Sequence, residues 1–352
     1  MKLGSGLKRL AITVAMLGGA SGANQGAAVR AVPAEAAFAA VTPWDGTLSV
    51  LTYNVKGLPW PIASDRPADL AEIGRRLHEM RRRGTGPQVV VLQEAFTDEA
   101  RAIGLSAGYR HIVSGPAAGE ASDAAMTEAD RRFAGDARWW LGETFGSFVS
   151  SGLQVLSDHP VIRVRRLVYP RFACAGSDCL ANKGALLVTL RLPDGSLVDV
   201  LTTHLNSRHS SGAPDARSLQ AYRRQAEFLS AFINQWHDPA VPLVAAGDYN
   251  VGTAPARGQA LIAQVAGWRG AAKFRDALRQ VAGRQTERGT PIPASVSAVM
   301  HHNADWTLFA PGTNAPLCPV AIRIPFGPDA KGRALSDHIG FTAVFRLAGA
   351  RC

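Results

Sequence analysis

Short apolar runs that end in polar side chains recur along the chain. The three clearest examples span residues 48–55, 89–94 and 241–250. The first alternates between apolar and polar positions, and the other two are nearly continuous apolar runs. Patterns of this length are typical of β-strands with one or both faces buried. We therefore predict three strands that carry polar residues at their ends.

The polar residues at these strand ends are Asn54, Glu94, Asp248 and Asn250. A buried run that ends in a carboxylate has few structural explanations, because an unpaired buried carboxylate is costly. In an extended backbone, positions i and i+2 point to the same side, so Asp248 and Asn250 can face one ligand while Tyr249 turns away. A plain turn is the alternative, since Asp and Asn after glycine favour turns.

Further strands are predicted at residues 151–157, 161–164, 185–192, 197–203, 303–309 and at the end of 334–345. The first two look like a strand pair around the turn at 158–160. The next two form a hairpin around the turn at 193–196. That hairpin presents His204 and Asn206 with the same i, i+2 spacing.

Helices are predicted where apolar residues recur at helical spacing, at residues 69–83, 216–235, 256–265 and 271–281. Residues 284–299 are interpreted as a loop-rich insertion, and residues 123–142 as polar and helical in parts. Trp139 and Trp140 lie close in sequence to Phe145. Packing in the core is the commoner fate of such aromatics, and docking on a membrane interface is the alternative.

The N-terminus has the pattern of a secretory signal peptide: basic residues, an apolar run at 10–17 and then small residues. The apolar run is too short for a membrane span. We expect a signal peptide at 1–23, a disordered leader at 24–43 and one domain at 44–352. A chain of 352 residues, 47% of them hydrophobic, can build one large core. The protein is therefore expected to be secreted or periplasmic.

Four cysteines in an exported chain fit one or two disulfides, and three full pairings are possible. Cys174 and Cys179 close a short polar loop and form the favoured pair, while Cys318 can pair with Cys352. The sequence contains no C-x-x-C motif, so a thiolate zinc site is not expected.

The chain carries a formal charge of +10, most of whose excess comes from scattered arginines. A basic surface favours polyanions, either nucleic acid or anionic lipid headgroups. Because the arginines are scattered, solvated faces explain them better than a dedicated patch.

Nine polar residues fall where strands are predicted to end: Asn54, Glu94, His204, Asn206, Asp248, Asn250, Asp305, Asp337 and His338. Packing two sheets would bring these ends to one rim. Oxygen donors such as Asn54, Glu94 and Asp248 suit a hard divalent cation, above all Mg²⁺, with Mn²⁺ or another divalent ion as alternatives. Two histidines can transfer protons near neutral pH, and Asp305 can orient His338 as a base. This set of groups suits hydrolysis of a phosphoester by in-line attack of water.

The other histidines show no such pattern. His159 lies in a predicted turn and is interpreted as structural. We interpret His209, His237, His301 and His302 as surface residues.

Six motifs, in this order, resemble those of the endonuclease/exonuclease/phosphatase superfamily. They are Thr52-Tyr53-Asn54-Val55, Gln93-Glu94, Thr203-His204-Leu205-Asn206, Gly247-Asp248-Tyr249-Asn250, Asp305-Trp306 and Ser336-Asp337-His338. The resemblance covers about residues 48–347. Within it, segment 174–184 looks like the corresponding segment of bacterial and neutral sphingomyelinases. The resemblance implies an α/β (α+β) four-layer sandwich: two packed, mostly antiparallel sheets flanked by helices.

The resemblance also implies roles for individual residues. Glu94 would bind the catalytic Mg²⁺ with help from Asn54. His338 would be the general base, held by Asp305, and Asp337 would support the metal or the base.

Four further roles follow from the same resemblance. Asp248 and Asn250 would orient the water and the phosphate. His204 would stabilise the phosphorane or the leaving oxygen. Lys183 would contact the phosphate or headgroup, and Asn206 would help to bind the substrate.

Two departures from the family pattern stand out. Tyr249 occupies a position where bacterial sphingomyelinases often carry Met. No aromatic hairpin of the membrane-inserting kind is evident before the last strand, because the apolar stretch at 322–326 is short and interrupted.

The leading hypothesis is a secreted Mg²⁺-dependent phosphodiesterase of sphingomyelinase C type, which acts on a phospholipid or sphingolipid at a membrane surface. A secreted nuclease on the same fold is the alternative, and its partner would be nucleic acid. A non-catalytic binding protein is the third hypothesis, and the complete acid, amide and histidine set argues against it. No protein partner is inferred.

Overall fold

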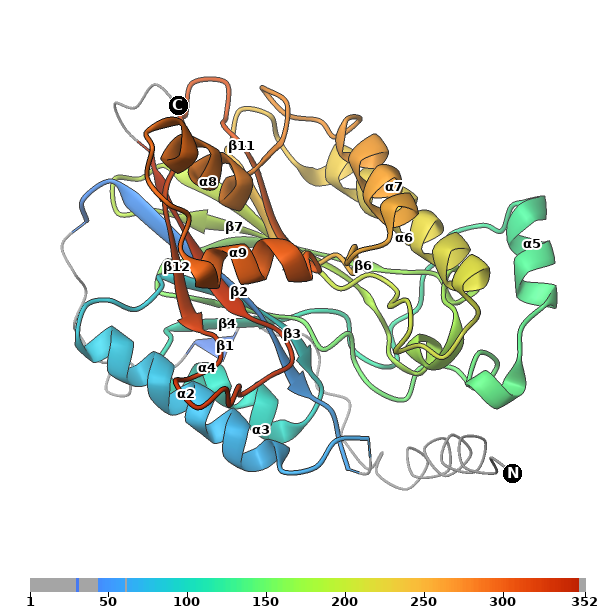
Figure 1. Cartoon of the computed structure of the whole chain (residues 1–352). Coiled ribbons are helices and arrows are strands. Elements are labelled where there is room, and N and C mark those ends of the chain that lie inside the picture. The colour runs from blue at the N-terminus through green and yellow to red at the C-terminus, as the bar shows by residue number, and fades with distance from the viewer. Residues whose placement is uncertain (1–29, 32–43, 61, 348–352) are drawn as a thin grey trace.

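The computed structural model describes residues 30–31, 44–60 and 62–347. They form two β-sheets packed face to face, with helices on the outer faces (Figure 1). This is the four-layer sandwich that the sequence predicts. The predicted signal peptide lies outside the described residues, as does the predicted leader apart from residues 30–31. Within the described part of the chain, no helix has the length and apolar character needed to cross a bilayer.

The first sheet has seven strands in the spatial order β1-β4-β5-β3-β2-β13-β12. Their bounds are Arg30–Ala31 (β1), His111–Ser114 (β4), Gln154–Ser157 (β5), Val89–Ala95 (β3), Thr47–Gly57 (β2), Gly340–Arg346 (β13) and Cys318–Phe326 (β12). β2 and β3 run parallel, and the other neighbours are antiparallel. The parallel pair brings Asn54 and Glu94, near the ends of β2 and β3, to the same edge of the sheet.

The second sheet has six strands in the order β10-β11-β9-β8-β7-β6. Their bounds are Arg275–Asp276 (β10), Asp305–Ala310 (β11), Leu243–Asp248 (β9), Leu197–Thr203 (β8), Gly184–Arg191 (β7) and Val161–Val168 (β6). β8 and β9 are the parallel pair here, and β7 and β8 form the predicted hairpin. Because β8 and β9 run parallel, both strands end at the same edge of the second sheet.

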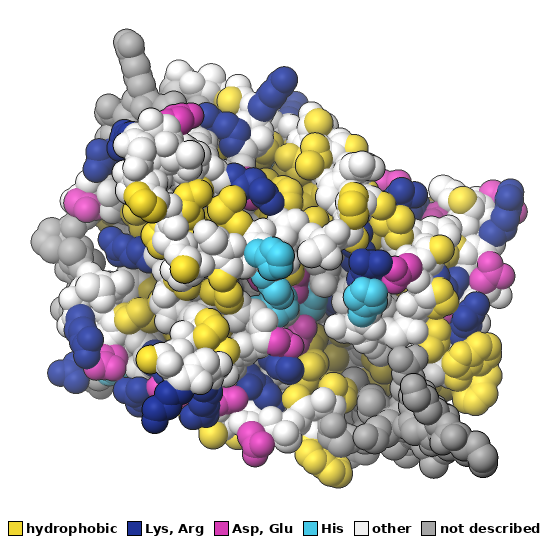
Figure 2. Space-filling model, viewed as in Figure 1, with side chains coloured by type: hydrophobic (Ala, Val, Ile, Leu, Met, Phe, Trp, Pro, Cys, Tyr) yellow, Lys and Arg dark blue, Asp and Glu magenta, His cyan; other side chains and the backbone are white. Residues whose placement is uncertain are grey.

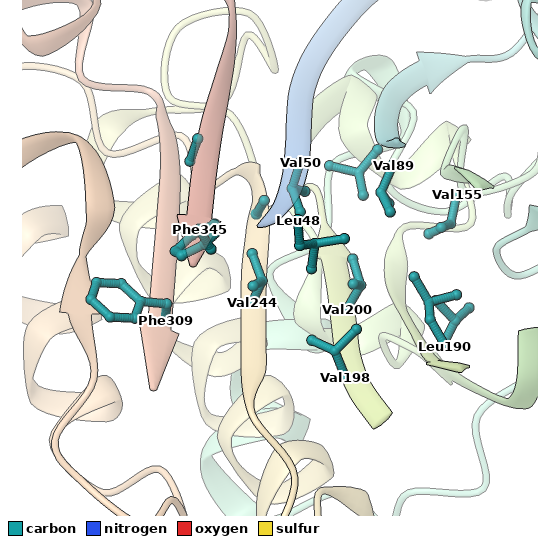
Figure 3. Packing of buried hydrophobic residues seen from close by; sticks show 14 of the residues in the cluster. Leu48, Val50, Val89, Val155, Leu190, Val198, Val200, Val244, Phe309 and Phe345 are labelled. Atoms are coloured by element: carbon teal, nitrogen blue, oxygen red, sulfur yellow. The ribbon is translucent and has the colours of Figure 1, made fainter. Parts of the chain in front are cut away.

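The main core lies between the two sheets, where apolar side chains from both meet (Figure 3). Strand β2 shows how the alternating sequence builds it. Leu48 and Val50 join the cluster between the sheets, whereas Leu51 and Tyr53 join the cluster beneath helix α2 (Arg66–Arg82). Since successive strand residues point to opposite faces, one strand supplies both apolar layers.

Helices cover the sandwich on both sides (Figure 1). Besides α2, they are α3 (Asp98–Arg101), α4 (Ile103–Ser106), α5 (Glu128–Gly135), α6 (Asp215–Trp236), α7 (Pro255–Val265), α8 (Ala277–Glu287) and α9 (Ala294–His302). In the described ranges, short 3₁₀ helices span Trp139–Leu141 (η2), Arg171–Ala173 (η3) and Gly176–Leu180 (η4). Helix α5 extends away from the body of the sandwich (Figure 1).

The predicted strand pair at 151–157 and 161–164 is wrong. β5 pairs with β3 and β4 in the first sheet, whereas β6 pairs with β7 in the second. Both edges of β5 are already bonded to neighbours, so β6 has no edge there to join. The turn at 158–160 therefore carries the chain from one sheet to the other.

The predicted loop-rich insertion at 284–299 is also wrong. Helix α8 continues to Glu287, and α9 begins at Ala294. In α9, Val296 and Val299 lie one turn apart and pack in a cluster with Phe341. Helix α8 begins later than predicted, because Asp276 caps its N-terminus by accepting a hydrogen bond from the Arg279 amide.

Candidate active site

The predicted strand-end residues meet at one edge of the sandwich. Cα pairing places Asp248 opposite Asp305 on β11 and beside His204, which follows β8. Glu94, His204, Asp248 and His338 line one pocket of about 360 Å³. Figure 2 shows histidine and acidic side chains gathered near the middle of this face of the molecule.

Asn54 links the two sheets across the site. Its Nδ2 donates to Glu94 Oε1 and to Asp248 Oδ2, both at 3.0 Å, and its Oδ1 accepts from the Lys56 amide at 3.0 Å. In this geometry the amide group holds two carboxylates together. Asn54 was predicted as a metal ligand, but its oxygen would reach a cation beside Glu94 only after the amide turned over.

Glu94 has the properties of a cation ligand. Its backbone is in the left-handed region, with φ of 57°, which directs the end of β3 into the pocket. Burial raises the pKa of its carboxyl group. Keeping that group ionised at neutral pH therefore calls for positive charge nearby, and carboxylate oxygens are ligands that Mg²⁺ prefers. The donor set at this end of the pocket fits a hard divalent cation.

His338 is paired with Asp305, as predicted. Its Nδ1 lies 2.7 Å from Asp305 Oδ2, so the Nδ1 proton is donated to the carboxylate and Nε2 is left facing Asp248 Oδ2 at 3.7 Å. Burial opposes charge on the imidazole, but Asp305 and Asp248 together raise the pKa of His338 to about 10. Asp305 itself is enclosed, and that burial raises its pKa against the influence of His338.

Asp248 is the centre of the cluster. Its Oδ2 lies 3.4 Å from His204 Nε2, and its Oδ1 accepts from the Asn250 amide at 2.9 Å. Although burial works the other way, the two histidines hold the pKa of Asp248 down to about 2. Asp248 is therefore ionised throughout the physiological range.

Lys183 is buried and contacts His204. Its Nζ lies 2.8 Å from Asp178 Oδ2, 3.2 Å from His204 Nε2 and 3.1 Å from the Leu205 carbonyl oxygen. Because an ammonium group only donates, His204 Nε2 is the acceptor and its proton resides on Nδ1. Burial and Lys183 lower the pKa of His204 to about 4, so this imidazole is neutral at physiological pH.

The Cys174–Cys179 disulfide closes the loop that carries Asp178, and this confirms the favoured pairing. Asp178 Oδ2 also accepts from the Ser207 amide at 2.5 Å. The loop therefore fixes the carboxylate that holds Lys183. The other predicted pair includes Cys352, which lies outside the described residues.

Asp337 lies at the rim of the site, with 58% of its side chain exposed. Lys56 Nζ lies 2.9 Å from its Oδ2, and although burial opposes the shift, Lys56 and His338 lower the pKa of Asp337. Asp337 lines the pocket together with His338.

The two asparagines predicted by the i, i+2 rule differ. Asn250 lines the pocket and donates from Nδ2 to the Leu205 carbonyl at 2.8 Å, while Tyr249 turns into the core as predicted. Asn206 is fully buried and is not among the pocket residues. Its Oδ1 accepts from the Ala175 amide and its Nδ2 donates to the Ser207 carbonyl, so it supports the disulfide loop. The rule fails there because β8 ends at Thr203.

The sequence interpretation missed some residues. His302 was interpreted as a surface residue, but its Nδ1 lies 3.8 Å from Asp305 Oδ2 and its ring lies edge-on to His338 at 4.8 Å. These three side chains also form a cluster that could hold a metal ion. His237 was likewise interpreted as a surface residue, yet it is buried with Nδ1 2.8 Å from Asp199 Oδ2. The signal that could have found His302 is its position at the end of a helix, three residues before Asp305.

One wall of the pocket is apolar, and serines and His209 line part of the remainder. The apolar wall is formed by Leu58, Pro59, Ile62, Phe96, Trp140, Leu141, Val149, Leu180 and Ala181. Trp140 is 52% exposed, and Trp60, in the same loop as Pro59, is 79% exposed. The charged groups therefore adjoin an apolar wall, with aromatic side chains on the nearby surface.

A sequence model of the Endonuclease/Exonuclease/phosphatase family matches residues 51–338, which include every strand-end residue of the site. The chain belongs to this family. It is therefore a hydrolase of a family that acts on phosphoesters.

Sphingomyelinases are among the curated relatives of the chain. Those of Mycobacterium bovis and of Mycobacterium tuberculosis are each 27% identical over 314 residues, a match that covers 86% of this chain and 54% of the relative. The chain thus spans about half the length of the curated relatives that it matches.

Solved structures of the family share the fold. Sphingomyelinase C from Streptomyces griseocarneus is 21% identical with a TM-score of 0.53, and the match covers 85% of this chain and 99% of that one. A variant of beta toxin from Staphylococcus aureus with bound magnesium ions is 16% identical with a TM-score of 0.55, covering 84% and 98%. A humanized TDP2 from D. rerio is 18% identical with a TM-score of 0.54, covering 85% and 99%. At these identities the likeness is one of fold.

Proposed function

We propose that the protein is an exported, Mg²⁺-dependent phosphodiesterase of sphingomyelinase type, which hydrolyses the headgroup phosphodiester of a sphingolipid or phospholipid. The observation that carries this proposal is the composition of the pocket. The acid and histidine cluster that suits phosphoester hydrolysis shares one cavity with nine apolar side chains. A lipid presents the same two features side by side, a charged phosphodiester and an apolar chain.

Different side chains have different roles in the proposed reaction. Glu94, with Asn54 beside it, would hold the divalent cation. The cation would supply positive charge that lowers the pKa of His338 and of the attacking water, and that neutralises charge on the phosphoryl oxygens. His338 Nε2 is the nitrogen free to take a proton from the water, because Nδ1 is committed to Asp305.

The remaining groups bind and orient the substrate. Asp248 lies beside His338 Nε2 and accepts a hydrogen bond from the water, which directs that water toward phosphorus. Lys183 and Asn250 would contact the phosphate, and His204 would stabilise the leaving oxygen once its Nε2 carries a proton. Asp337 supports His338 from the rim.

Export is part of the proposal. It is supported by the N-terminal sequence pattern and by the Cys174–Cys179 disulfide, since disulfides persist in oxidising compartments. The substrate would be met at a membrane surface outside the cytoplasm.

A nuclease is the second candidate function. The formal charge of +10 favours it, as does the fold shared with a D. rerio TDP2 that was solved with a single-strand DNA product. The apolar pocket wall argues against it, because a nucleic-acid backbone offers no long apolar chain to fill that wall.

One paired assay separates the two functions. Purified protein with Mg²⁺ is incubated with sphingomyelin vesicles or with supercoiled plasmid, and the Asp248→Ala variant serves as the control. Phosphocholine release by the wild type alone, without nicking, supports the lipid function. Nicking without phosphocholine release supports the nuclease, and neither activity from folded protein refutes both.

A further inference from the structure

Helix α7 carries an arginine that is completely enclosed. Arg257 is 1% exposed, and its guanidinium lies over the ring of Tyr222 at 4.6 Å. In the part of the chain that the structure describes, no carboxylate oxygen lies within 4.0 Å of its nitrogens. A buried cation without a direct counter-ion is costly unless its N–H groups are bonded. The hydrogen bonds of the guanidinium must therefore offset the cost of burying it.

Among the described residues, the guanidinium donates to oxygens of the neighbouring loops and of α6. Nη1 donates to the Asn206 carbonyl at 2.5 Å and to the Asn250 carbonyl at 3.1 Å. Nη2 donates to the Ser207 carbonyl and to Ser218 Oγ, both at 3.2 Å. A planar guanidinium presents several donors in a fixed fork, so it can hold carbonyls of two separate segments at a set distance.

Those segments are the two loops that carry the site. One follows β8 directly after His204, and the other follows β9 directly after Asp248. Asn250 has φ of 50°, an uncommon conformation for a residue other than glycine, and its amide donates to Asp248 Oδ1. Arg257 accordingly binds the carbonyl of the residue whose amide orients Asp248.

We propose that Arg257 is a positioning residue, which ties the β8 and β9 loops together and so sets the 3.4 Å separation of His204 Nε2 and Asp248 Oδ2. The kinetic part of the test rests on the proposed function. Lysine keeps the charge but has no planar fork, and methionine keeps the length but has neither charge nor donors. Both substitutions should release the loops.

The experiment compares Arg257→Lys and Arg257→Met with a matched control, Arg81→Lys. Arg81 is also a largely buried arginine over a tyrosine, Tyr109, but it bonds to Asp158 and lies away from the pocket. Kinetics are measured well below the unfolding midpoint of each protein. Both Arg257 variants should lose roughly 10- to 100-fold in kcat with KM within about threefold, as expected when reacting groups shift by a fraction of an ångström to an ångström. The control should lose stability while keeping kcat.

Three results would overturn the proposal: wild-type kcat in folded Arg257→Met, full activity in Arg257→Lys, or a rise in KM at constant kcat. Full activity in Arg257→Lys would assign the residue a charge effect, and a rise in KM at constant kcat would assign it an effect on substrate binding. A second readout does not depend on substrate. Crystal structures of the two variants should show the Asn206 and Asn250 carbonyls moved apart, and unmoved loops refute the proposal. If the wild type cleaves no phosphodiester, the proposed function fails, and these structures still decide the role of Arg257.

Discussion

Replacing Asp305 by asparagine tests the proton-transfer pair at the centre of the site. The substitution keeps the shape of the side chain and removes its negative charge. The bond from His338 Nδ1 to Asp305 Oδ2 is 2.7 Å long and partly buried, and hydrogen bonds to charged groups contribute about 1.5–3 kcal/mol. Among the groups that raise the pKa of His338 from 6.5 to about 10, Asp305 has the largest effect.

The expected effect on rate follows from that bond. A loss of about 2–3 kcal/mol in holding the base corresponds to roughly 30- to 150-fold in kcat. KM should stay within about threefold, because Asp305 is not among the pocket residues. The assay is steady-state phosphocholine release from mixed micelles over a range of pH.

The pH dependence has a definite sign. His338 acts as a base only when neutral, so kcat/KM rises with pH through its pKa. Removing the carboxylate lowers that pKa, and the rising limb should move to lower pH in Asp305→Asn. The imidazolium also adds stability that is present below about pH 6.5 and is lost as pH rises toward 10. The stability deficit of the variant should therefore shrink with rising pH.

Asp276→Asn is the matched control. Asp276 is largely buried on the neighbouring strand β10 and caps helix α8, a task that asparagine also performs. Its kcat should equal that of the wild type. Unchanged kcat in Asp305→Asn, or a rising limb displaced to higher pH, would refute the assigned pairing.

Three further predictions follow from the site. Glu94→Gln should weaken Mg²⁺ binding at least tenfold by calorimetry, because it removes the carboxylate charge, and EDTA should abolish wild-type activity; activity that survives chelation refutes the metal assignment. Cys174→Ser with Cys179→Ser should lower the free energy of unfolding by about 2 kcal/mol in urea titrations, as a short closed loop predicts, and a reductant should destabilise the wild type by at least as much; a wild type unaffected by reductant contradicts this. Trp139→Ser with Trp140→Ser should reduce activity on vesicles about tenfold while sparing a soluble short-chain phosphodiester, and an equal loss on both substrates would place these residues in the chemistry instead.

The strands and most of the site could be predicted because their signals are local. A strand that is buried on one or both faces has a recognisable pattern of apolar residues in the sequence. The end of each apolar run marks where the next side chain reaches the edge of the sandwich. That reasoning predicts Asn54, Glu94, Asp248 and Asp305 in one cluster.

The wrong predictions concern features that depend on contacts between residues far apart in the sequence. Which sheet β6 joins depends on which strand edges are free, and that information lies far away in the sequence. Asn206 was assigned to the pocket because the backbone after Thr203 was expected to keep the i, i+2 spacing of a strand, whereas β8 ends at Thr203. His302 was missed because most of helix α9 was interpreted as a loop. The sequence therefore showed no helical pattern from which the contact of His302 with His338 could be predicted.

The central claim is that this pocket hydrolyses a lipid headgroup phosphodiester by attack of water on phosphorus. The most direct test is the hydrolysis of sphingomyelin vesicles with Mg²⁺ in ¹⁸O-labelled water, followed by mass spectrometry of both products. We predict phosphocholine that carries one ¹⁸O atom and ceramide that carries none, with no product from Asp248→Ala. Label in the ceramide, or no phosphocholine from folded wild-type protein, would contradict the account.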